Sequence, residues 1–307
     1  MRLLITGGAG FIGSHLCDQL ISDGHEVVVL DNLCSGRWDN LAHHDTGRLT
    51  RIEGDVRDES WAAKVGEIDV IYHLAALISG HDSLHEPESY LSVNVGGLFR
   101  VLAMAKAKRA RIVFASSSTV YGSQERDACR ETDLPTPLTV YALTKLIGEH
   151  LLALYAPMYG ISHTSLRLFN VYGPRQSPNH PYANVTCKFS YAAATNEGVN
   201  LYGDGEQSRD FVYVDDVVRA FLLVGSESDA PVYNVGTGQE TSIVELLSLV
   251  RELSRNSVEA SPCPPWPNDI GSIRADISRI REAYDFVPKT SLRDGLRATI
   301  DSFKHHA

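Results

Sequence analysis

The chain has 307 residues, a formal net charge of −10, 43% hydrophobic residues and 21% charged residues. This length and composition allow a large hydrophobic core and favour a globular protein with more than one lobe. The acidic charge argues against nucleic acid as a partner, and the lack of any apolar run of about 18 residues argues against a membrane-spanning helix.

The first half of the chain alternates short apolar runs with stretches of helical periodicity. The apolar runs predict buried strands, which we place over residues 2–6, 27–30, 51–53, 70–74, 111–115 and 164–168. The amphipathic stretches predict helices over residues 14–22, 60–65, 89–107 and 141–155. This alternation is typical of an α/β fold, and we expect a Rossmann-type, doubly wound parallel sheet with helices on both faces.

The composition changes after residue 168, where proline-rich stretches cover 170–182 and 261–271. In this half we predict helices over 184–195 and 242–253, and strands over 209–214 and 232–235. We therefore expect two domains. A Rossmann domain covers 1–168, with strands that return to it from about 211–236, and a smaller C-terminal α/β lobe covers 169–307.

Glycines dominate the first turn between strand and helix. Gly7, Gly10 and Gly13 follow the first predicted strand and open the first helix. Such a turn lets the backbone approach a pyrophosphate, to which the helix N-terminus offers N–H donors. Asp31 stands 18 residues after Gly13, at the end of the second strand. A carboxylate there accepts hydrogen bonds from a ribose and repels a 2′-phosphate, so we predict NAD rather than NADP.

A tyrosine and a lysine four residues apart form the candidate catalytic pair. Tyr141 and Lys145 share one face of the helix that they open. A phenol has a pKa of about 10, and a cation about 4 Å away is worth roughly 4 kcal/mol to its anion. We therefore expect Lys145 to lower the pKa of Tyr141, so that the phenol can exchange a proton with an alcohol. Hydroxyl side chains from Ser116 to Thr119 follow a predicted strand, at the sheet edge where ligands bind.

Ten sequence motifs occur in the order found in the extended short-chain dehydrogenase/reductase family. They are TGGAGFIGSHL (6–16), LDNL (30–33), GDVRD (54–58), HLAA (73–76), NVGG (94–97), SSSTVYG (116–122), YALTK (141–145), LRLFNVYGPRQ (166–176), YGDGEQSRDFVYVDDV (202–217) and NVGTG (234–238). The chain resembles this family, and within it the nucleotide-sugar epimerases and dehydratases, along nearly its whole length. The resemblance implies that the first domain binds NAD and the second a nucleotide sugar.

The resemblance also implies roles for single residues. Ser117, Tyr141 and Lys145 are the implied catalytic residues, with Tyr141 as acid and base and Lys145 on the nicotinamide ribose. The implied cofactor contacts, besides the last two, are Gly7, Gly10, Phe11, Ile12, Asp31, Asn32, Ser35, Gly36, Asp55, Val56, Leu74, Ala75, Ala76, Asn94, Ser116 and Phe169. The implied substrate contacts are Ser117, Ser118, Thr119, Asn170, Asn184, Val185, Tyr202, Arg209 and Asp269.

Ser118 and Thr119 bear on which reaction the resemblance implies. Dehydratases of this family carry Asp-Glu directly after the catalytic hydroxyl residue, and UDP-glucuronate decarboxylases carry a Glu at the place of Thr119. Hydroxyls at both places favour a 4-epimerase, with a UDP-hexose or UDP-N-acetylhexosamine as substrate. The implied mechanism is a transient oxidation, in which Tyr141 takes the proton of the 4′-hydroxyl, NAD takes the hydride, and the 4-keto sugar turns over before both are returned.

Three alternatives use the same fold. A nucleotide-4-keto-sugar reductase would exchange its cofactor at each turnover, and a dehydratase would eliminate water. A non-catalytic sensor would lack Tyr141 or Lys145, and both are present. Trp266 stands where the epimerases often have an Arg that contacts phosphate, which leaves open a nucleotide other than UDP. Ile273 stands where a Tyr often narrows the sugar pocket. The smaller Ile273 favours a larger sugar, such as an N-acetylated one.

The five cysteines are irregularly spaced and form no CxxC pair. We therefore predict no disulfide framework and no metal site, and a reducing cytoplasm fits this composition. His81 and His85 would share one helix face but belong to no metal-binding motif. The family resemblance implies a homodimer, formed through the helices near 89–107 and 141–155. We predict neither nucleic acid nor a membrane as a partner.

Overall fold

The computed structural model describes residues 1–44, 47–123, 127–178, 183–226, 230–254, 258–265 and 271–304. The chain divides into two compact units, which we describe separately. Unit 1 consists of Met1–Gly122, Leu134–Arg167 and Val218–Tyr233, and unit 2 of Ser123–Asp133, Leu168–Val217 and Asn234–Ala307. Among the described residues, none of the helices combines the length and the apolar character that crossing a bilayer requires.

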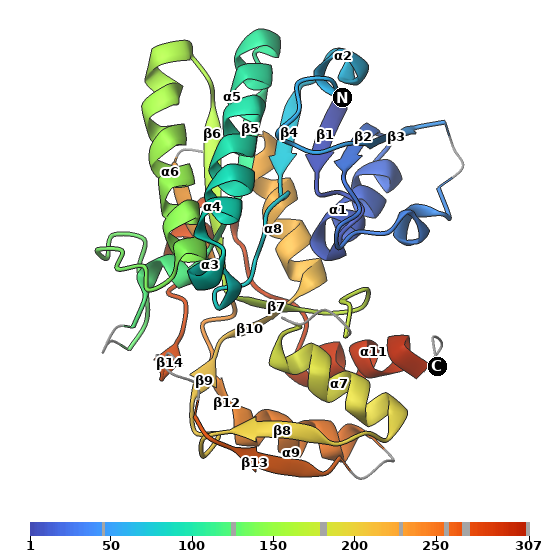
Figure 1. Cartoon of the computed structure of the whole chain (residues 1–307), viewed down its shortest axis with the longest axis vertical. Helices are drawn as coiled ribbons and strands as arrows, with labels where there is room; N and C mark the ends of the chain where they lie inside the picture. Colours follow the sequence, from blue (N-terminus) through green and yellow to red (C-terminus); the bar gives the residue numbers. More distant parts are fainter. Residues whose placement is uncertain are drawn as a thin grey trace. The chain divides into compact units, whose positions relative to one another are not determined.

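A seven-stranded sheet confirms the predicted α/β fold (Figure 1). Its strands are β1 (Arg2–Thr6), β2 (Glu26–Asp31), β3 (Leu49–Glu53), β4 (Val70–His73), β5 (Arg111–Ser117), β6 (His163–Leu168) and β11 (Val232–Val235). The strand order is β11-β6-β5-β4-β1-β2-β3, and β1 pairs in parallel with both β2 and β4. The direction of winding reverses at β1, which is where ligands bind in such sheets.

Helices cover both faces of this sheet. The main ones are α1 (Phe11–Ser22), α5 (Gly97–Lys108), α6 (Val140–Tyr159) and α8 (Val214–Ser226). Because side chains alternate along a strand, Leu4 packs in a buried cluster with Val101 of α5, while Tyr72 of β4 lies on the other face. There the rings of Tyr72 and Phe221 of α8 have their centres 6.2 Å apart. The sheet is therefore doubly wound.

The helix predicted over 89–107 is interrupted by a wider turn. The structure has α4 (Pro87–Tyr90), a π-helical turn labelled η2 (Leu91–Gly96), and then α5. This turn buries the side chain of Asn94, whose amide bonds to Leu77 and Thr144. Single π-helical turns commonly occur at functional sites. Short elements complete unit 1: η1 (Trp38–Leu41), α2 (Ala62–Val65), α3 (Asp82–His85) and η3 (Ser118–Tyr121).

Unit 2 contains three small sheets and several helices. The sheets pair β7 (Asn170–Tyr172) with β10 (Phe211–Tyr213), β8 (Val199–Tyr202) with β13 (Ala260–Cys263), and β9 (Ser208–Arg209) with both β12 (Thr241–Ser242) and β14 (Ser272–Ile273). The helices are α7 (Val185–Thr195), α9 (Ile243–Leu253), α10 (Ser278–Tyr284) and α11 (Leu292–Lys304), with the first residues of α8.

The single strand predicted over 209–214 is divided into β9 and β10 by Asp210. The Asp210 side chain is fully buried, and its carboxylate accepts hydrogen bonds from the backbone N–H groups of Thr237, Gly238 and Ala275. These bonds hold the chain in a bend at Asp210. In a continuous strand the buried carboxylate would lose these partners. As a result, β10 pairs with β7, and of the predicted returning strands only β11 joins the seven-stranded sheet.

Candidate active site

The glycine-rich turn of unit 1 has the geometry that a dinucleotide needs. Gly7 has a φ of 73°, and a Cβ atom on Gly13 would lie 2.3 Å from the carbonyl oxygen of Gly7. Helix α1 begins at Phe11 with Gly10 as its N-cap, and no side chain caps it. The N–H groups of its first turn, including that of Ile12, therefore face no competing side-chain acceptor. This arrangement fits the pyrophosphate of NAD.

Asp31 lies at the end of β2, where sequence analysis places the ribose contact. The side chain is buried, and its two carboxylate oxygens accept hydrogen bonds from the N–H groups of Ala9 (2.9 Å) and Leu33 (2.8 Å). Burial raises the pKa of Asp31, while these two bonds act in the opposite direction. A carboxylate has about four lone pairs, so it can also accept from a diol. A Cβ atom on Gly36 would lie 2.9 Å from the same oxygens, which explains a glycine there.

We predict that Asp31→Ala weakens NAD binding by at least about tenfold, because it removes one or two hydrogen bonds to a charged acceptor. NADP binding should weaken less, since the variant no longer repels a 2′-phosphate. Titration calorimetry with both cofactors measures the ratio. Asp39→Ala, an exposed carboxylate in the same segment, is the control. An unchanged ratio of the two affinities would remove the ribose role from Asp31.

Asn94 fixes the segment after β4, where Leu74, Ala75 and Ala76 are predicted to line the cofactor. Its Oδ1 atom accepts from the N–H of Leu77 (2.8 Å), and its Nδ2 atom donates to the carbonyl of Leu77 (3.0 Å) and to Thr144 Oγ1 (2.9 Å). Thr144 precedes Lys145 on α6. The buried amide therefore ties this segment to the helix that carries the candidate catalytic pair.

The other predicted cofactor residues lie in several places. Asp55 pairs with Arg57 at 2.7 Å, and this pair holds the pKa of Asp55 down to about 2. Val56 is buried against Gly97, where a Cβ atom would come within 2.5 Å of it. Asn32 and Ser35 follow Asp31 in the chain. Phe169 is buried in unit 2, where its N–H donates to the carbonyl of Val235.

The structure brings Ser117, Tyr141 and Lys145 together within unit 1. Tyr141 and Lys145 lie one turn apart at the start of α6, which Thr139 caps. The Lys145 ammonium donates to the carbonyl of Ala115 (2.8 Å) and lies 5.8 Å from the centre of the Tyr141 ring. Ser117 is the last residue of β5, and its hydroxyl lies close enough to Tyr141 to lower the pKa of the phenol. The phenol of Tyr141, the ammonium of Lys145 and the hydroxyl of Ser117 therefore lie close together.

Burial is the main cause of the pKa shifts of both Tyr141 and Lys145. It raises the pKa of Tyr141 to about 12, against the hydrogen bond from Ser117, and it lowers the pKa of Lys145 to about 7. The direction for Tyr141 is opposite to the one that spacing alone predicts, because burial removes water from both groups. A positive charge brought beside the phenol would favour its anion and lower the pKa again.

We predict that the stability of the protein depends on pH through Lys145. Its folded pKa of about 7 lies below the value of about 10.4 for an unfolded lysine, so between these values the unfolded chain binds more protons and stability rises with pH. Lys145→Met should therefore stabilise the protein most at and below about pH 7. Above about pH 7, the difference in free energy of unfolding between the variant and wild type should narrow by about 1 kcal/mol per pH unit.

Thermal denaturation at several pH values measures this difference. Lys64→Met, on the exposed surface of α2, is the control and should show no such trend. A difference between Lys145→Met and wild type that stays constant with pH would mean that Lys145 is not held in the neutral form by burial.

A buried ion pair that the sequence did not predict involves the same helix as the candidate catalytic pair. Arg167 of β6 and Glu149 of α6 are joined at 2.7 Å, with side-chain exposures of 5% and 6%. The Ser116 hydroxyl donates to the Glu149 carboxylate, and the Arg167 guanidinium lies 4.8 Å from the centre of the Tyr121 ring. The signal in the sequence was the position of Glu149, four residues after Lys145 on one helix face.

Unit 2 holds most of the residues predicted to contact the substrate. Asn170 begins β7, and its N–H donates to the carbonyl of Asp210. Asn184 caps α7, which begins at Val185: its Oδ1 atom accepts from Cys187, and its Nδ2 atom donates to the carbonyl of Val171. The Asn184 amide therefore already makes the bonds that join α7 to β7.

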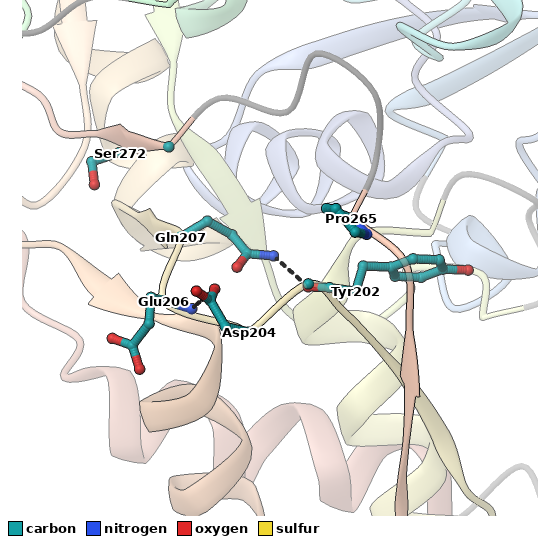
Figure 2. A pocket seen from close by; sticks show the side chains of 8 residues that line it. Tyr202, Asp204, Glu206, Gln207, Pro265 and Ser272 are labelled. Atoms are coloured by element: carbon teal, nitrogen blue, oxygen red, sulfur yellow. Dashed lines mark hydrogen bonds between the residues drawn. The ribbon is translucent and has the colours of Figure 1, made fainter.

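A cavity of about 340 Å³ in unit 2 is lined by Tyr202. Figure 2 shows Tyr202 and Pro265 at one end of it, and Asp204, Glu206 and Ser272 at the other. Gln207 donates to the carbonyl of Tyr202 at 3.1 Å. A half-buried ring beside a hollow with hydrogen-bonding groups suits a flat heterocycle.

Arg209 is placed on β9, which runs parallel to β14. Its guanidinium donates to the carbonyls of Ser208 (2.8 Å) and Gly271 (3.3 Å). Ile273 lies opposite Arg209 in this pairing and is buried. Asp269 and Trp266 lie outside the described residues.

Comparisons with known proteins agree with this geometry. Residues 3–236 match the model of the NAD dependent epimerase/dehydratase family. A curated UDP-glucose 4-epimerase from Mycolicibacterium smegmatis is 38% identical over 312 residues, which cover 99% of each chain. UDP-glucuronic acid decarboxylase 1 from Xenopus tropicalis is 35% identical, over 99% of this chain and 72% of that one. A solved UDP-N-acetylglucosamine 4-epimerase from Methanobrevibacter ruminantium, in complex with UDP-N-acetylmuramic acid, has a TM-score of 0.95 at 35% identity, over 100% of this chain and 99% of that one.

Proposed function

Because this chain belongs to the NAD dependent epimerase/dehydratase family, we propose that it is an NAD-dependent 4-epimerase of a UDP-activated sugar. The substrate is a UDP-hexose or a UDP-N-acetylhexosamine. One observation carries the proposal: the half-buried Tyr141 lies beside the buried Lys145 and Ser117, while Ser118 and Thr119 supply hydroxyls and no carboxylate where an eliminating or decarboxylating enzyme needs one.

The residues of this chain move protons and hold the reactants. When bound, NAD would supply a two-electron acceptor for the hydrogen on C4 of the sugar and a donor for its return. Tyr141 removes the proton from the 4′-hydroxyl and later returns it to the carbonyl oxygen. Ser117, which lowers the pKa of Tyr141, would direct the Tyr141 hydroxyl. Lys145 holds the nicotinamide ribose and, when protonated, stabilises the phenolate.

The two other reactions of the family need groups that this site lacks. A dehydratase removes a proton from carbon with a carboxylate, and Ser118 and Thr119 are too weakly basic for that step. The family's decarboxylases, one of which is among the relatives, carry a Glu at the place of Thr119. Here the Thr119 hydroxyl donates to Ser117 at 2.9 Å, within the catalytic cluster.

We assign the nucleotide to unit 2. Tyr202 would pack on the base in the 340 Å³ cavity, and Arg209 would pair with a phosphate. In domain terms, residues 1–168 with the returning strand would bind NAD, and residues 169–307 the nucleotide sugar. Ile273 stands where a Tyr is often found in the epimerases, and its smaller side chain favours an N-acetylated sugar.

We also propose a homodimer in the cytoplasm. Apolar side chains stand exposed along α5 and α6, which run side by side in Figure 1: Phe99, Leu143, Leu154 and Met158 are 43%, 41%, 56% and 59% exposed. An apolar stripe of this kind suits a helical interface. Light scattering should give twice the chain mass for wild type and the monomer mass for Leu154→Glu/Met158→Glu.

None of the five cysteines, all among the described residues, forms a disulfide, which suits a reducing compartment.

A panel of UDP-, dTDP-, GDP- and CDP-sugars tests the proposed activity. Each is incubated with the enzyme and NAD, and the products are separated by chromatography. We expect interconversion of a UDP-sugar with its C4 epimer at a fixed equilibrium ratio and no net change in absorbance at 340 nm. Formation of a keto sugar, release of CO₂ or consumption of NADH in proportion to product would contradict epimerisation.

A further inference from the structure

Two adjacent histidines converge on one carboxylate at a distance along the chain from the catalytic residues. Asp18 lies on α1, and His43 and His44 follow η1. The Nε2 atoms of His43 and His44 lie 3.1 Å and 2.7 Å from the same Asp18 oxygen, Oδ1. One ligand atom from each residue lies within 4.8 Å of the others, and the two imidazole centres are 4.2 Å apart.

This set of donors matches the preferences of zinc and similar cations. Zinc binds imidazole nitrogen at about 2.0–2.1 Å and carboxylate oxygen at about 2.0–2.2 Å, so in a tetrahedral site the ligand atoms lie roughly 3.4 Å apart. The observed separations from Asp18 Oδ1, 3.1 Å and 2.7 Å, would need to grow by roughly 0.3 Å and 0.7 Å. Two neutral imidazoles and one carboxylate carry a single negative charge, which favours a divalent cation.

The cluster is partly buried but has an open side. The side chains of His44, Asp18 and His43 are 11%, 28% and 51% exposed. His44 and Asp18 are partly shielded from water, and the exposed His43 leaves a path by which a cation can enter. A water molecule can complete the fourth position from the same side.

The backbone holds His44 in place. The Arg51 guanidinium of β3 donates to the carbonyls of Leu41 (2.7 Å) and His44 (3.2 Å). The N–H of His44 also donates to the carbonyl of Leu41, at 3.2 Å. These bonds shape the turn independently of the imidazoles. The backbone that carries His44 is therefore in position before a cation binds.

We propose that Asp18, His43 and His44 form a site for a divalent transition-metal cation, best matched by zinc, which fastens the segment after β2 onto α1. The same segment contacts the glycine-rich turn, since Arg37 N–H (3.0 Å) and Asn40 Nδ2 (2.9 Å) both donate to the carbonyl of Ala9. The cation would therefore stabilise the segment that begins at the ribose-binding Asp31, without taking part in the reaction.

Zinc binding to the untagged holoenzyme tests the proposal. The protein is treated with a chelator, dialysed and titrated with ZnCl₂ by calorimetry, and its melting temperature is followed in parallel. We expect one zinc per chain and a rise in melting temperature of about 5 °C at about 100 times the Kd. Asp18→Asn and His44→Gln should each weaken the affinity by at least about 100-fold, since even residues outside the coordination shell cost 10–100-fold.

His81→Gln/His85→Gln is the matched control, because it removes another pair of neighbouring imidazoles, 4.9 Å apart between ring centres. It should bind zinc and respond to it as wild type does. The proposal is overturned if wild type binds no zinc, or if Asp18→Asn and His44→Gln bind it as tightly as wild type. It is equally overturned if the His81/His85 variant is the one that loses the zinc.

Discussion

Replacing Tyr141 by Phe should lower the turnover number by at least about 100-fold, the usual scale for loss of a group that transfers a proton in the rate-limiting chemistry. Only one oxygen atom is removed from a side chain at the start of α6, and the ring that packs there is kept. The melting temperature and the affinity for NAD should therefore stay close to the wild-type values. Steady-state kinetics with the UDP-sugar found in the panel measures the effect.

Tyr159→Phe is the matched control for this prediction. Tyr159 is the last residue of the same helix and is 39% exposed, so the loss of its hydroxyl should leave turnover unchanged. Near-normal turnover in Tyr141→Phe would remove Tyr141 from the mechanism. A large loss in both variants would point to an effect on the helix as a whole.

Replacing Arg167 by Met should lower the free energy of unfolding by about 3–5 kcal/mol, because it leaves the Glu149 carboxylate buried without its cation. The two side chains are 5% and 6% exposed, so water cannot replace the lost partner. The double variant Glu149→Leu/Arg167→Met should recover most of this loss, since it removes both charges. Chemical denaturation of the variants measures these differences.

The exposed pair of Arg293 and Glu252, at 45% and 61% side-chain exposure, provides the control. Arg293→Met should leave the denaturation midpoint unchanged, because solvent screens such a pair. An Arg167→Met variant as stable as wild type would show that burial of the Glu149 carboxylate without its partner carries no cost. A double variant no better than the single one would show that packing, and not charge, is lost.

The sequence predicted the seven-stranded sheet well because its strands are short apolar runs bounded by glycine, proline or charge. Residues 2–6, for example, are a strand both by pattern and in the structure. The glycine-rich turn was predicted with the same accuracy, since Gly7 and Gly13 occupy positions that exclude a side chain. In both the strands and the turn, the local sequence determines the backbone conformation.

The elements that were missed depend on contacts between distant parts of the chain. β8 and β13 pair in parallel although Val199 and Ala260 are far apart in sequence, and β13 contains Pro262, which does not suggest a strand. The division between β9 and β10 results from the buried Asp210, whose partners lie at 237, 238 and 275. Local periodicity contains no information on such partners.

The candidate site shows the same division. Spacing along a helix placed Tyr141 beside Lys145, but it could not predict that burial would raise one pKa to about 12 and lower the other to about 7. Glu149 and Arg167 are in separate elements, and only the tertiary fold shows that they pair. For the same reason, the sequence predicted no metal site, while the fold brings Asp18 to His43 and His44.

The fate of the hydrogen on C4 tests the central claim most directly. The UDP-sugar identified in the panel is labelled with deuterium at C4 of the sugar and incubated with the enzyme in ordinary water, and the product is analysed by NMR and mass spectrometry. A hydride that leaves C4 and returns to it predicts an epimer that keeps its deuterium at that carbon. Loss of the label to water would contradict the account, because the hydrogen would then have left as a proton.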